Sequence, residues 1–282
     1  MQNYETIKVD EREDGISILT FNRPKRLNAI NLQFTEEILD YLKSLENSLD
    51  IRVLILIGEG RAFSSGLDLK DFQNVNKRKI PEEYQKYTYL LTDDKIKRSV
   101  IVQKLISQMM VQLRKIPQPV IAAVKGSAYG GGLTLALAAD IRVAGESAKF
   151  CNAFVKIGVS GADCGSSYWL PRLIGFSRAA EFMYTGKVID AKEADKIGLV
   201  SKVVSDSNLL SESLNIANQI LNKSPLGIIL TKDALNINVD ASSLEAAIKL
   251  ENRTQVVCSN SADILEGVSA TLEKREAKYN KW

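Results

Sequence analysis

The chain has 282 residues, 45% of them hydrophobic, which is enough for one large domain or for a domain with an appendage. Its 37 basic and 34 acidic side chains leave a net charge of +3, which argues against general nucleic-acid binding but leaves room for a local basic patch that meets a phosphate-bearing ligand. The chain contains no histidine, so Ser-His-Asp triads, Cys-His pairs and the usual zinc sites are excluded, and a general acid or base must be a carboxylate, lysine, tyrosine or cysteine.

The cysteines and the N-terminus predict a cytoplasmic protein. Cys151, Cys164 and Cys258 form no C-x-x-C pair, and an odd number of cysteines cannot all pair within one chain. This usage is typical of reduced thiols in the cytosol. The first residues lack the apolar core of a signal peptide, and no stretch approaches the length of a membrane span.

Strands and a helix are predicted before the first glycine-rich loop. Apolar residues recur at helical spacing after Asn31, whose side chain can cap the helix. The apolar run at 53–57 indicates a buried strand, and the glycine-rich loop 58–66 follows it. Segment 73–98 is polar with little periodicity, which indicates a solvated surface segment or a lid. The predicted elements of this half are strands at 6–10, 15–21 and 53–57 and helices at 32–49, 67–72 and 101–113.

The middle of the chain predicts a strand at 120–124, a glycine turn, a buried helix at 133–139 and a strand from Asp140. The first N–H groups of a helix lack partners within it, and the helix dipole makes that end positive. The turn is either a packing turn or a site for an anion or oxyanion. It lacks the G-x-G-x-x-G dinucleotide pattern, and no Lys-Ser or Lys-Thr pair closes a phosphate loop.

The order strand, glycine loop, short helix occurs twice. It ends once at Gly66-Leu67 and once at Gly130-Gly131. Two such loops could direct two backbone N–H groups at one oxygen, which is the requirement of an oxyanion hole. The repetition therefore favours the functional interpretation of both loops.

Asp163 lies among glycines and small apolar residues before a predicted helix at 166–170. It is either a turn or N-cap aspartate or a carboxylate in a dry pocket that moves protons. From residue 207 onward the chain carries only helix signals, which predict a helical appendage whose apolar faces could pack on a neighbouring subunit. The further predicted elements are helices at 177–184, 191–197, 214–221, 226–235, 244–257 and 264–278 and a strand at 199–204.

With these residues in view, the chain resembles the crotonase superfamily of acyl-CoA enzymes, also called the enoyl-CoA hydratase/isomerase family. The similarity covers nearly the whole chain. The motifs that carry it are NRPKRLNA at 22–29, RAFSSGLDL at 61–69, PVIAAVKGSAYGGG at 119–132, ADIRVA at 139–144, LPRLIG at 170–175, GKVIDAKEA at 186–194 and GLV at 198–200.

The resemblance implies an α/β fold, the crotonase-like (ClpP/crotonase) spiral of β-β-α turns with a C-terminal helical region. On that basis residues 1–205 are expected to form the spiral core and residues 206–282 a helical region used in trimerisation. It further implies an acyl-CoA substrate in fatty-acid or related metabolism, assembly as a homotrimer or hexamer, and no cofactor beyond the coenzyme A moiety of the substrate. No metal, nucleic acid or membrane is expected.

The resemblance also assigns site residues. The backbone N–H groups of Leu67 and Gly131 would hold the thioester oxygen, and Asp163 would be the catalytic acid. An aromatic and a basic residue near the C-terminus, Tyr279 and Lys281, would reach the CoA of a neighbour. The remaining positions expected around the acyl-CoA are Arg26, Leu27, Ala62, Ser64, Ser65, Gly66, Asp68, Leu69, Lys70, Tyr129, Gly130, Thr134 and Phe154.

Departures from the family pattern bear on the reaction. Hydratases of the family position water with two glutamates, and here those positions hold Thr134 and Phe154. The dienoyl-CoA isomerase branch has acids at both positions plus a third aspartate, which Asp163 matches after a one-residue insertion. A double-bond shift carried by one carboxylate is therefore the favoured reaction. The alternatives are hydration, hydrolysis or decarboxylation using Tyr129, Asp68 or an acid from segment 73–98, and an acyl-CoA-binding protein without catalysis.

Overall fold

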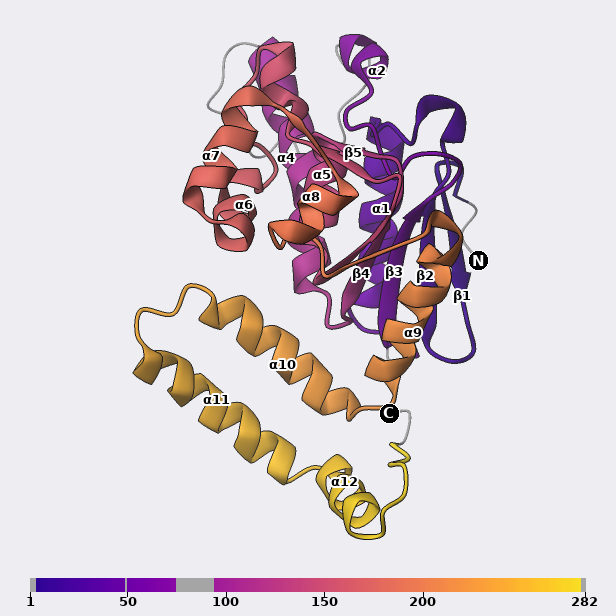
Figure 1. Ribbon diagram of the computed structural model, residues 1–282, viewed down its shortest axis with the longest axis vertical. Coiled ribbons are helices and arrows are strands. Elements are labelled where there is room, and N and C mark those ends of the chain that lie inside the picture. Colours follow the sequence, from indigo (N-terminus) through magenta and orange to yellow (C-terminus); the bar gives the residue numbers. More distant parts are fainter. Residues whose placement is uncertain (1–3, 49, 75–93, 280–282) are drawn as a thin grey trace.

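A six-stranded sheet forms the centre of the fold in the computed structural model, which describes residues 4–48, 50–74 and 94–279 (Figure 1). The strand order is β1-β2-β3-β4-β6-β9. β1 runs antiparallel to β2, and the other neighbouring pairs are parallel. The strands are β1 (Ile7–Glu11), β2 (Ile16–Phe21), β3 (Val53–Gly58), β4 (Val120–Val124), β6 (Ile141–Gly145) and β9 (Lys202–Val204).

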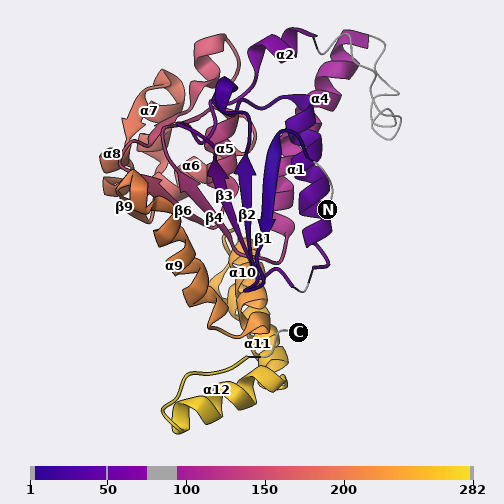
Figure 2. The same cartoon turned by 90° about the vertical axis from the view of Figure 1, so that its right-hand side faces the viewer.

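Both faces of the sheet are covered by helices, which explains the continuous apolar runs of its central strands. In β3, Leu54 and Leu56 belong to the larger core, while Val53 and Ile55 belong to a second core on the other face. Figure 2 shows α1 on one side of the sheet and α9 on the other. The helices of the larger core include α1 (Leu32–Leu45), α4 (Asp94–Lys115) and α5 (Gly131–Ala138), and α9 (Leu209–Leu221) covers the second.

A smaller three-stranded sheet begins just before Gly130, within the second glycine-rich segment. It has the order β5-β7-β8, with β5 parallel to β7 and β7 antiparallel to β8. This part of the chain also holds the helices that precede and follow Asp163. Its elements are β5 (Ser127–Tyr129), β7 (Lys149–Cys151), η3 (Ala153–Ile157), α6 (Ser166–Ile174), α7 (Phe176–Thr185), β8 (Val188–Asp190) and α8 (Ala191–Lys196).

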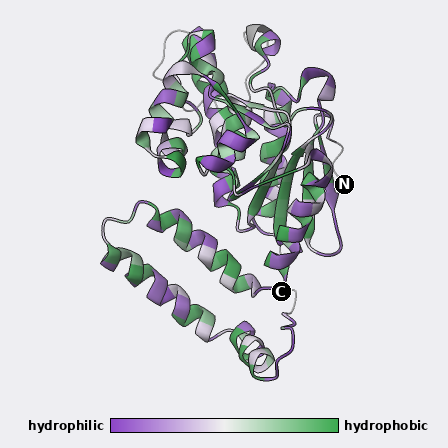
Figure 3. Cartoon of the chain, viewed as in Figure 1, coloured by the Kyte–Doolittle hydropathy of each residue, from purple (hydrophilic) through white to green (hydrophobic). Residues whose placement is uncertain are grey.

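The last helices project away from the sheet. Figures 1 and 2 show α10 (Pro225–Asn238), α11 (Leu244–Ser259) and α12 (Ala262–Leu272) at the end of the molecule opposite α2 (Leu69–Asn74). Figure 3 shows apolar and polar residues mixed along them. Leu244, Leu265 and Leu272 are each more than 70% exposed. These helices therefore present apolar side chains that the described part of the chain does not cover.

A buried lysine ties α10 to the core. Lys232 is 6% exposed, and its Nζ donates to the carbonyl oxygen of Gln118 at 2.7 Å and lies 3.0 Å from Asp140 Oδ2. Asp140 Oδ1 also pairs with Arg114 of α4 at 2.9 Å. A charged network thus fixes the start of the projecting region, whereas the preceding α9 lies directly on the sheet.

The predicted elements agree with the structure along most of the chain, with differences at a few places. The helix predicted at 264–278 is α12, which ends at Leu272, and the strand predicted at 199–204 is β9, which holds only Lys202–Val204. The strand β5 lies inside the predicted glycine turn. Residues 94–98, placed in the polar segment 73–98, form the first turns of α4, which begins at Asp94 rather than at residue 101. Residues 75–93 of the predicted lid lie outside the described residues. Within the described ranges, no helix combines the length and hydropathy that a membrane crossing requires.

Candidate active site

The first glycine loop is held by the polar connector before α1. Asn28 is fully buried, and its Nδ2 donates to the carbonyl oxygens of Glu59 at 3.0 Å and Ala62 at 2.8 Å. In return, Ser64 Oγ donates to the Asn28 carbonyl at 2.7 Å. Arg23 of the same connector forms an ion pair with Asp68 at 2.9 Å. These contacts fix the loop on both sides of Leu67.

Ile30 determines which way Leu67 faces. Its N–H donates to the Gly66 carbonyl at 2.8 Å, and its carbonyl accepts from the Asp68 N–H at 2.8 Å. These two hydrogen bonds define an isolated parallel bridge between Ile30 and Leu67. Because Gly66 and Asp68, the neighbours of Leu67, make both bonds of the bridge, the N–H of Leu67 itself points away from Ile30.

The two glycine loops lie in direct contact. Ser64 forms a parallel bridge with Ala128, in which its carbonyl accepts from the Tyr129 N–H at 3.0 Å. Gly66 has a φ of +88°, and a β-carbon at this position would lie 2.6 Å from the Tyr129 carbonyl oxygen and 3.3 Å from the Gly131 nitrogen. Only glycine fits so close an approach. The structure thus brings together the loops that carry Leu67 and Gly131.

Two backbone donors remain open at this junction. Gly131 is the first residue of α5, preceded by Gly130 with a φ of 49°. Among the described residues, neither the Gly131 N–H nor the Leu67 N–H donates to a backbone acceptor. Two unpartnered N–H groups on touching loops, one of them at a helix N-terminus, can together bind a carbonyl oxygen or an oxyanion.

The two positions that hold glutamates in hydratases are closely packed and uncharged. Thr134 is fully buried on α5, and its hydroxyl donates to the Gly131 carbonyl at 3.0 Å. Phe154 is 8% exposed on η3, and its ring lies 3.6 Å from where a β-carbon of Gly130 would be. Thr134 therefore supports the helix start, and Phe154 forms an aromatic wall beside it.

Asp163 lies on the segment between η3 and α6. Its backbone N–H donates to Ser166 Oγ at 3.1 Å, and its carbonyl accepts from the Ser166 N–H at 2.9 Å. Its Oδ1 accepts from the Cys164 N–H at 2.7 Å and from Gln103 Nε2 of α4. The turn geometry expected of an aspartate before a helix is present, and the side chain is additionally linked to α4. The hydrogen bonds of Asp163 thus go to α4, to the neighbouring Cys164 and to α6, whereas those of the glycine loops join the loops to each other.

The other groups considered as acids or bases are less suited to that role. Burial, followed by the charge of Asp163, raises the pKa of the Cys164 thiol and keeps it protonated. Burial raises the pKa of Tyr129 as well. For Asp68 burial opposes ionisation, but the hydrogen bond from Arg23 and further donors outweigh it and lower its pKa. Asp68 is therefore an ion-pair partner rather than a proton carrier.

The positions expected around coenzyme A form the rim and the interior of the first loop. Arg26, Leu69 and Lys70 are exposed at the rim. Leu27 has a left-handed φ of 50°, and its carbonyl accepts from the Ser65 N–H at 2.9 Å. Ala62, Ser64 and Asp68 are buried and serve the loop through their packing and hydrogen bonds.

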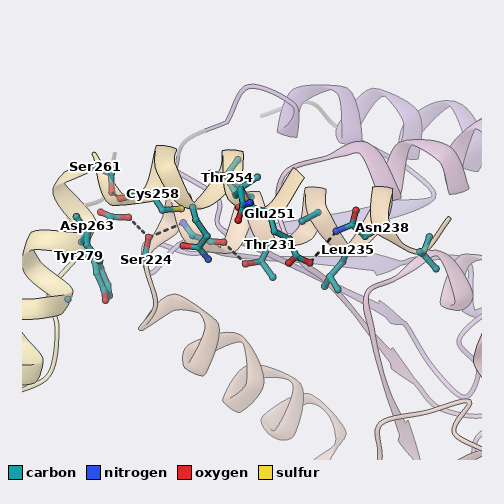
Figure 4. Close-up of a pocket in the computed structure, with 18 residues that line it drawn as sticks. Ser224, Thr231, Leu235, Asn238, Glu251, Thr254, Cys258, Ser261, Asp263 and Tyr279 are labelled. Carbon is teal, nitrogen blue, oxygen red and sulfur yellow. Dashed lines mark hydrogen bonds between the residues drawn. The ribbon is translucent and has the colours of Figure 1, made fainter. Parts of the chain in front are cut away.

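Tyr279 lies far from these loops. It lines a cavity of about 820 Å³ between α10, α11 and α12, together with residues such as Ser224 and Cys258 (Figure 4). That cavity is at the opposite end of the molecule from α2 and its loop (Figure 1). Lys281 lies outside the described residues. Tyr279 is thus separated from the Gly131 loop of its own chain.

Two residues near these groups were not among the predicted site residues. Arg23 and Gln103 contact Asp68 and Asp163 respectively. Arg23 stands within the motif at 22–29, so the motif itself could have indicated it. Gln103 carries no such signal, because it is one of several polar residues on an amphipathic helix.

Comparison with known proteins gives one family along nearly the whole chain. The model of the family "Enoyl-CoA hydratase/isomerase" matches residues 11–281. A probable enoyl-CoA hydratase of Mycobacterium bovis is 41% identical over 95% of this chain and 90% of its own length. The 1,2-epoxyphenylacetyl-CoA isomerase of Escherichia coli is 36% identical over 95% of both chains. The crystal structure of a probable enoyl-CoA hydratase/isomerase from Mycobacterium abscessus superposes with a TM-score of 0.86, at 36% identity over 98% of this chain and 99% of that one.

Proposed function

Because the chain belongs to the enoyl-CoA hydratase/isomerase family and therefore processes acyl-CoA, we propose that its reaction is a double-bond shift in an enoyl-CoA. The relatives are named both as hydratases and as an isomerase, so the choice rests on this chain's own residues. The observation that carries the proposal is the pair Thr134 and Phe154. Neither side chain can act as a general base, which removes the two-carboxylate arrangement that positions water.

The proposed chemistry begins at the two glycine loops. The N–H groups of Leu67 and Gly131 bind the thioester oxygen and stabilise the negative charge that it gains as an enolate forms. Loss of one such donor costs about 3 kcal/mol of transition-state stabilisation in comparable sites. This acidifies the carbon next to the thioester enough for a carboxylate to remove its proton.

Asp163 then carries the proton. Its carboxylate takes a proton from the α-carbon of a β,γ-unsaturated thioester, which leaves a dienolate on the substrate. The resulting carboxylic acid returns that proton to the γ-carbon, and the double bond moves into conjugation with the thioester. One carboxylate is sufficient because the proton that is removed is the proton that is returned.

We assign the coenzyme A moiety to the connector and rim of the first loop. Arg26 and Lys70 are exposed cations there, suited to phosphate groups. The proposed assembly is a homotrimer or hexamer through the exposed apolar faces of α10 to α12. Tyr279, remote from its own chain's loops, would then reach the coenzyme A bound by a neighbour, together with Lys281.

The test uses purified protein and a series of 3-enoyl-CoA thioesters. We expect the conjugated-thioester absorbance to rise with no change in product mass, and Asp163→Asn to lower kcat by about 10²–10⁴-fold. Wild-type rates in Asp163→Asn would remove Asp163 from the mechanism. Product heavier by one water molecule would favour hydration, and tight acyl-CoA binding without turnover across the series would favour a binding protein.

A further inference from the structure

Gln103 is the side chain from α4 that reaches the loop of Asp163. Its Nε2 donates to Asp163 Oδ1 and approaches Cys164 Sγ at 3.9 Å. Gln103 and Asp163 are 60 positions apart in the chain, so only the fold brings them together. An ionised carboxylate only accepts hydrogen bonds, which requires the amide nitrogen of Gln103 to face it.

The donors to Asp163 all reach one of its two carboxylate oxygens. Oδ1 accepts from Gln103 Nε2 and from the Cys164 N–H at 2.7 Å. Oδ2 accepts from no donor in the described part of the chain. Because one donor comes from α4 and the other from the residue next to Asp163, together they fix the plane of the carboxylate and not only its position. One oxygen is thereby anchored, and the other remains available.

The backbone of Asp163 is fixed separately from its side chain. Ser166 is fully buried, and its Oγ accepts from the Asp163 N–H at 3.1 Å and donates to the Gly161 carbonyl at 2.8 Å. Asn152, also fully buried, donates to the same carbonyl at 2.9 Å. These contacts hold the loop, whereas the hydrogen bond from Gln103 is the one that connects the carboxylate to α4 among the described residues. Removal of the Gln103 amide should therefore release the side chain without moving the loop.

We propose that Gln103 is a positioning residue, which holds Asp163 Oδ1 so that Oδ2 is the oxygen that exchanges the proton with the acyl carbon. This inference rests on the proposed function, in which Asp163 is the acid and base. An amide suits the role because it donates a hydrogen bond without forming an ion pair and without offering a titratable proton of its own. Proton transfer depends steeply on such alignment, and a small displacement of a catalytic group can cost about 100-fold in rate.

The experiment compares Gln103→Met, which keeps the length and removes the donor, with Gln108→Met on the same helix. Gln108 Nε2 faces Gln112 at 3.5 Å and not Asp163. With a 3-enoyl-CoA, we expect Gln103→Met to lower kcat by about 10–100-fold while KM stays within about twofold. Gln108→Met should match the wild type in both. If Gln103 had only a structural role, Gln103→Met would instead lower the midpoint of unfolding or change KM.

A second variant, Gln103→Glu, keeps the size and polarity but replaces the donor with an acceptor, and we expect the same loss of kcat. Gln103→Glu therefore tests the positioning role even where Gln103→Met aggregates and cannot be assayed. If Asp163→Asn is inactive while both Gln103 variants keep the wild-type kcat, the positioning role is overturned and the proposed function stands. If Asp163→Asn keeps the wild-type kcat, the proposed role of Asp163 fails, and the role of Gln103 fails with it.

Discussion

Gly66 and Gly131 face each other across the junction of the two glycine loops, so closely that a β-carbon on Gly66 would lie 3.3 Å from the Gly131 nitrogen. The two open N–H groups belong to Leu67, which follows Gly66, and to Gly131. The spacing between the loops therefore decides whether both donors can reach one oxygen. A side chain at this point would disturb the spacing directly.

Gly66→Ala should separate the loops and lower kcat/KM by about 100-fold or more, since one donor would leave the thioester oxygen. The new methyl group would collide with the Tyr129 carbonyl at 2.6 Å. Gly198→Ala is the matched control, because Gly198 has a similar φ of +77° but its β-carbon would meet only the Leu173 carbonyl, at 3.8 Å. The control should lose about 1 kcal/mol of stability and keep its activity. Equal kcat/KM in the two variants would contradict this account of the junction.

Asp68→Asn should destabilise the protein at neutral pH and lose this effect in acid. Ionised Asp68 is stabilised in the folded state by Arg23, which lowers its pKa in spite of burial. The stability that ionised Asp68 contributes is therefore present above its pKa in the unfolded state, about 3.9, and is lost as the pH falls through its lower pKa in the folded state. We expect a difference of about 2 kcal/mol in urea unfolding at pH 6 that shrinks below pH 4.

The control for Asp68 is Glu181→Gln, which removes an exposed partner of Lys187. It should change the free energy of unfolding by less than about 0.5 kcal/mol at either pH. A difference between wild type and Asp68→Asn that grows as the pH falls would show that the ion pair with Arg23 does not stabilise the fold.

Lys232→Met should loosen the projecting helices. The substitution leaves the Gln118 carbonyl without its charged donor and removes one of the two cations beside Asp140. We expect a loss of about 3 kcal/mol in unfolding free energy and faster amide hydrogen exchange in α10. Lys249→Met, which removes an exposed pair with Glu245, should have little effect. Unchanged exchange in α10 of Lys232→Met would show that other contacts anchor the helix.

Leu265→Asp should weaken self-association. Leu265 on α12 is 71% exposed in the single chain, and burial of such a side chain between subunits contributes about 2 kcal/mol. Sedimentation equilibrium should give the wild type three or six times the chain mass of 31.2 kDa and give the variant a larger share of single chains. Tyr184→Asp is the control, at a 77% exposed position on α7 and outside the projecting helices. A wild type that sediments as one chain would contradict the proposed assembly.

The sequence predicted those elements whose signal is local. Asn31 caps α1 as expected, accepting from the Phe34 N–H at 2.9 Å, and the apolar runs at 53–57 and 120–124 are buried strands. The short strands β5 and β8 were not predicted. Each has three residues, too few for a periodic pattern, and each is defined by pairing with a distant strand.

The site was predictable to the extent that glycine marks close backbone approach. Gly66 and Gly130 both adopt positive φ at the junction, as expected of glycines in such loops. The link between Gln103 and Asp163 could not be predicted, because a glutamine on an amphipathic helix is normally a solvated residue. The burial of Lys232 could not be predicted either. A lysine on an amphipathic helix is normally exposed, whereas in the fold Lys232 is buried against Asp140.

The most direct test of the central claim is a crystal structure with a bound, unreactive acyl-CoA analogue. We predict that the thioester oxygen lies about 3 Å from both the Leu67 and the Gly131 nitrogens, with Asp163 Oδ2 facing the α-carbon. A thioester oxygen bound elsewhere, or one of these two amides turned away from it, would contradict the account.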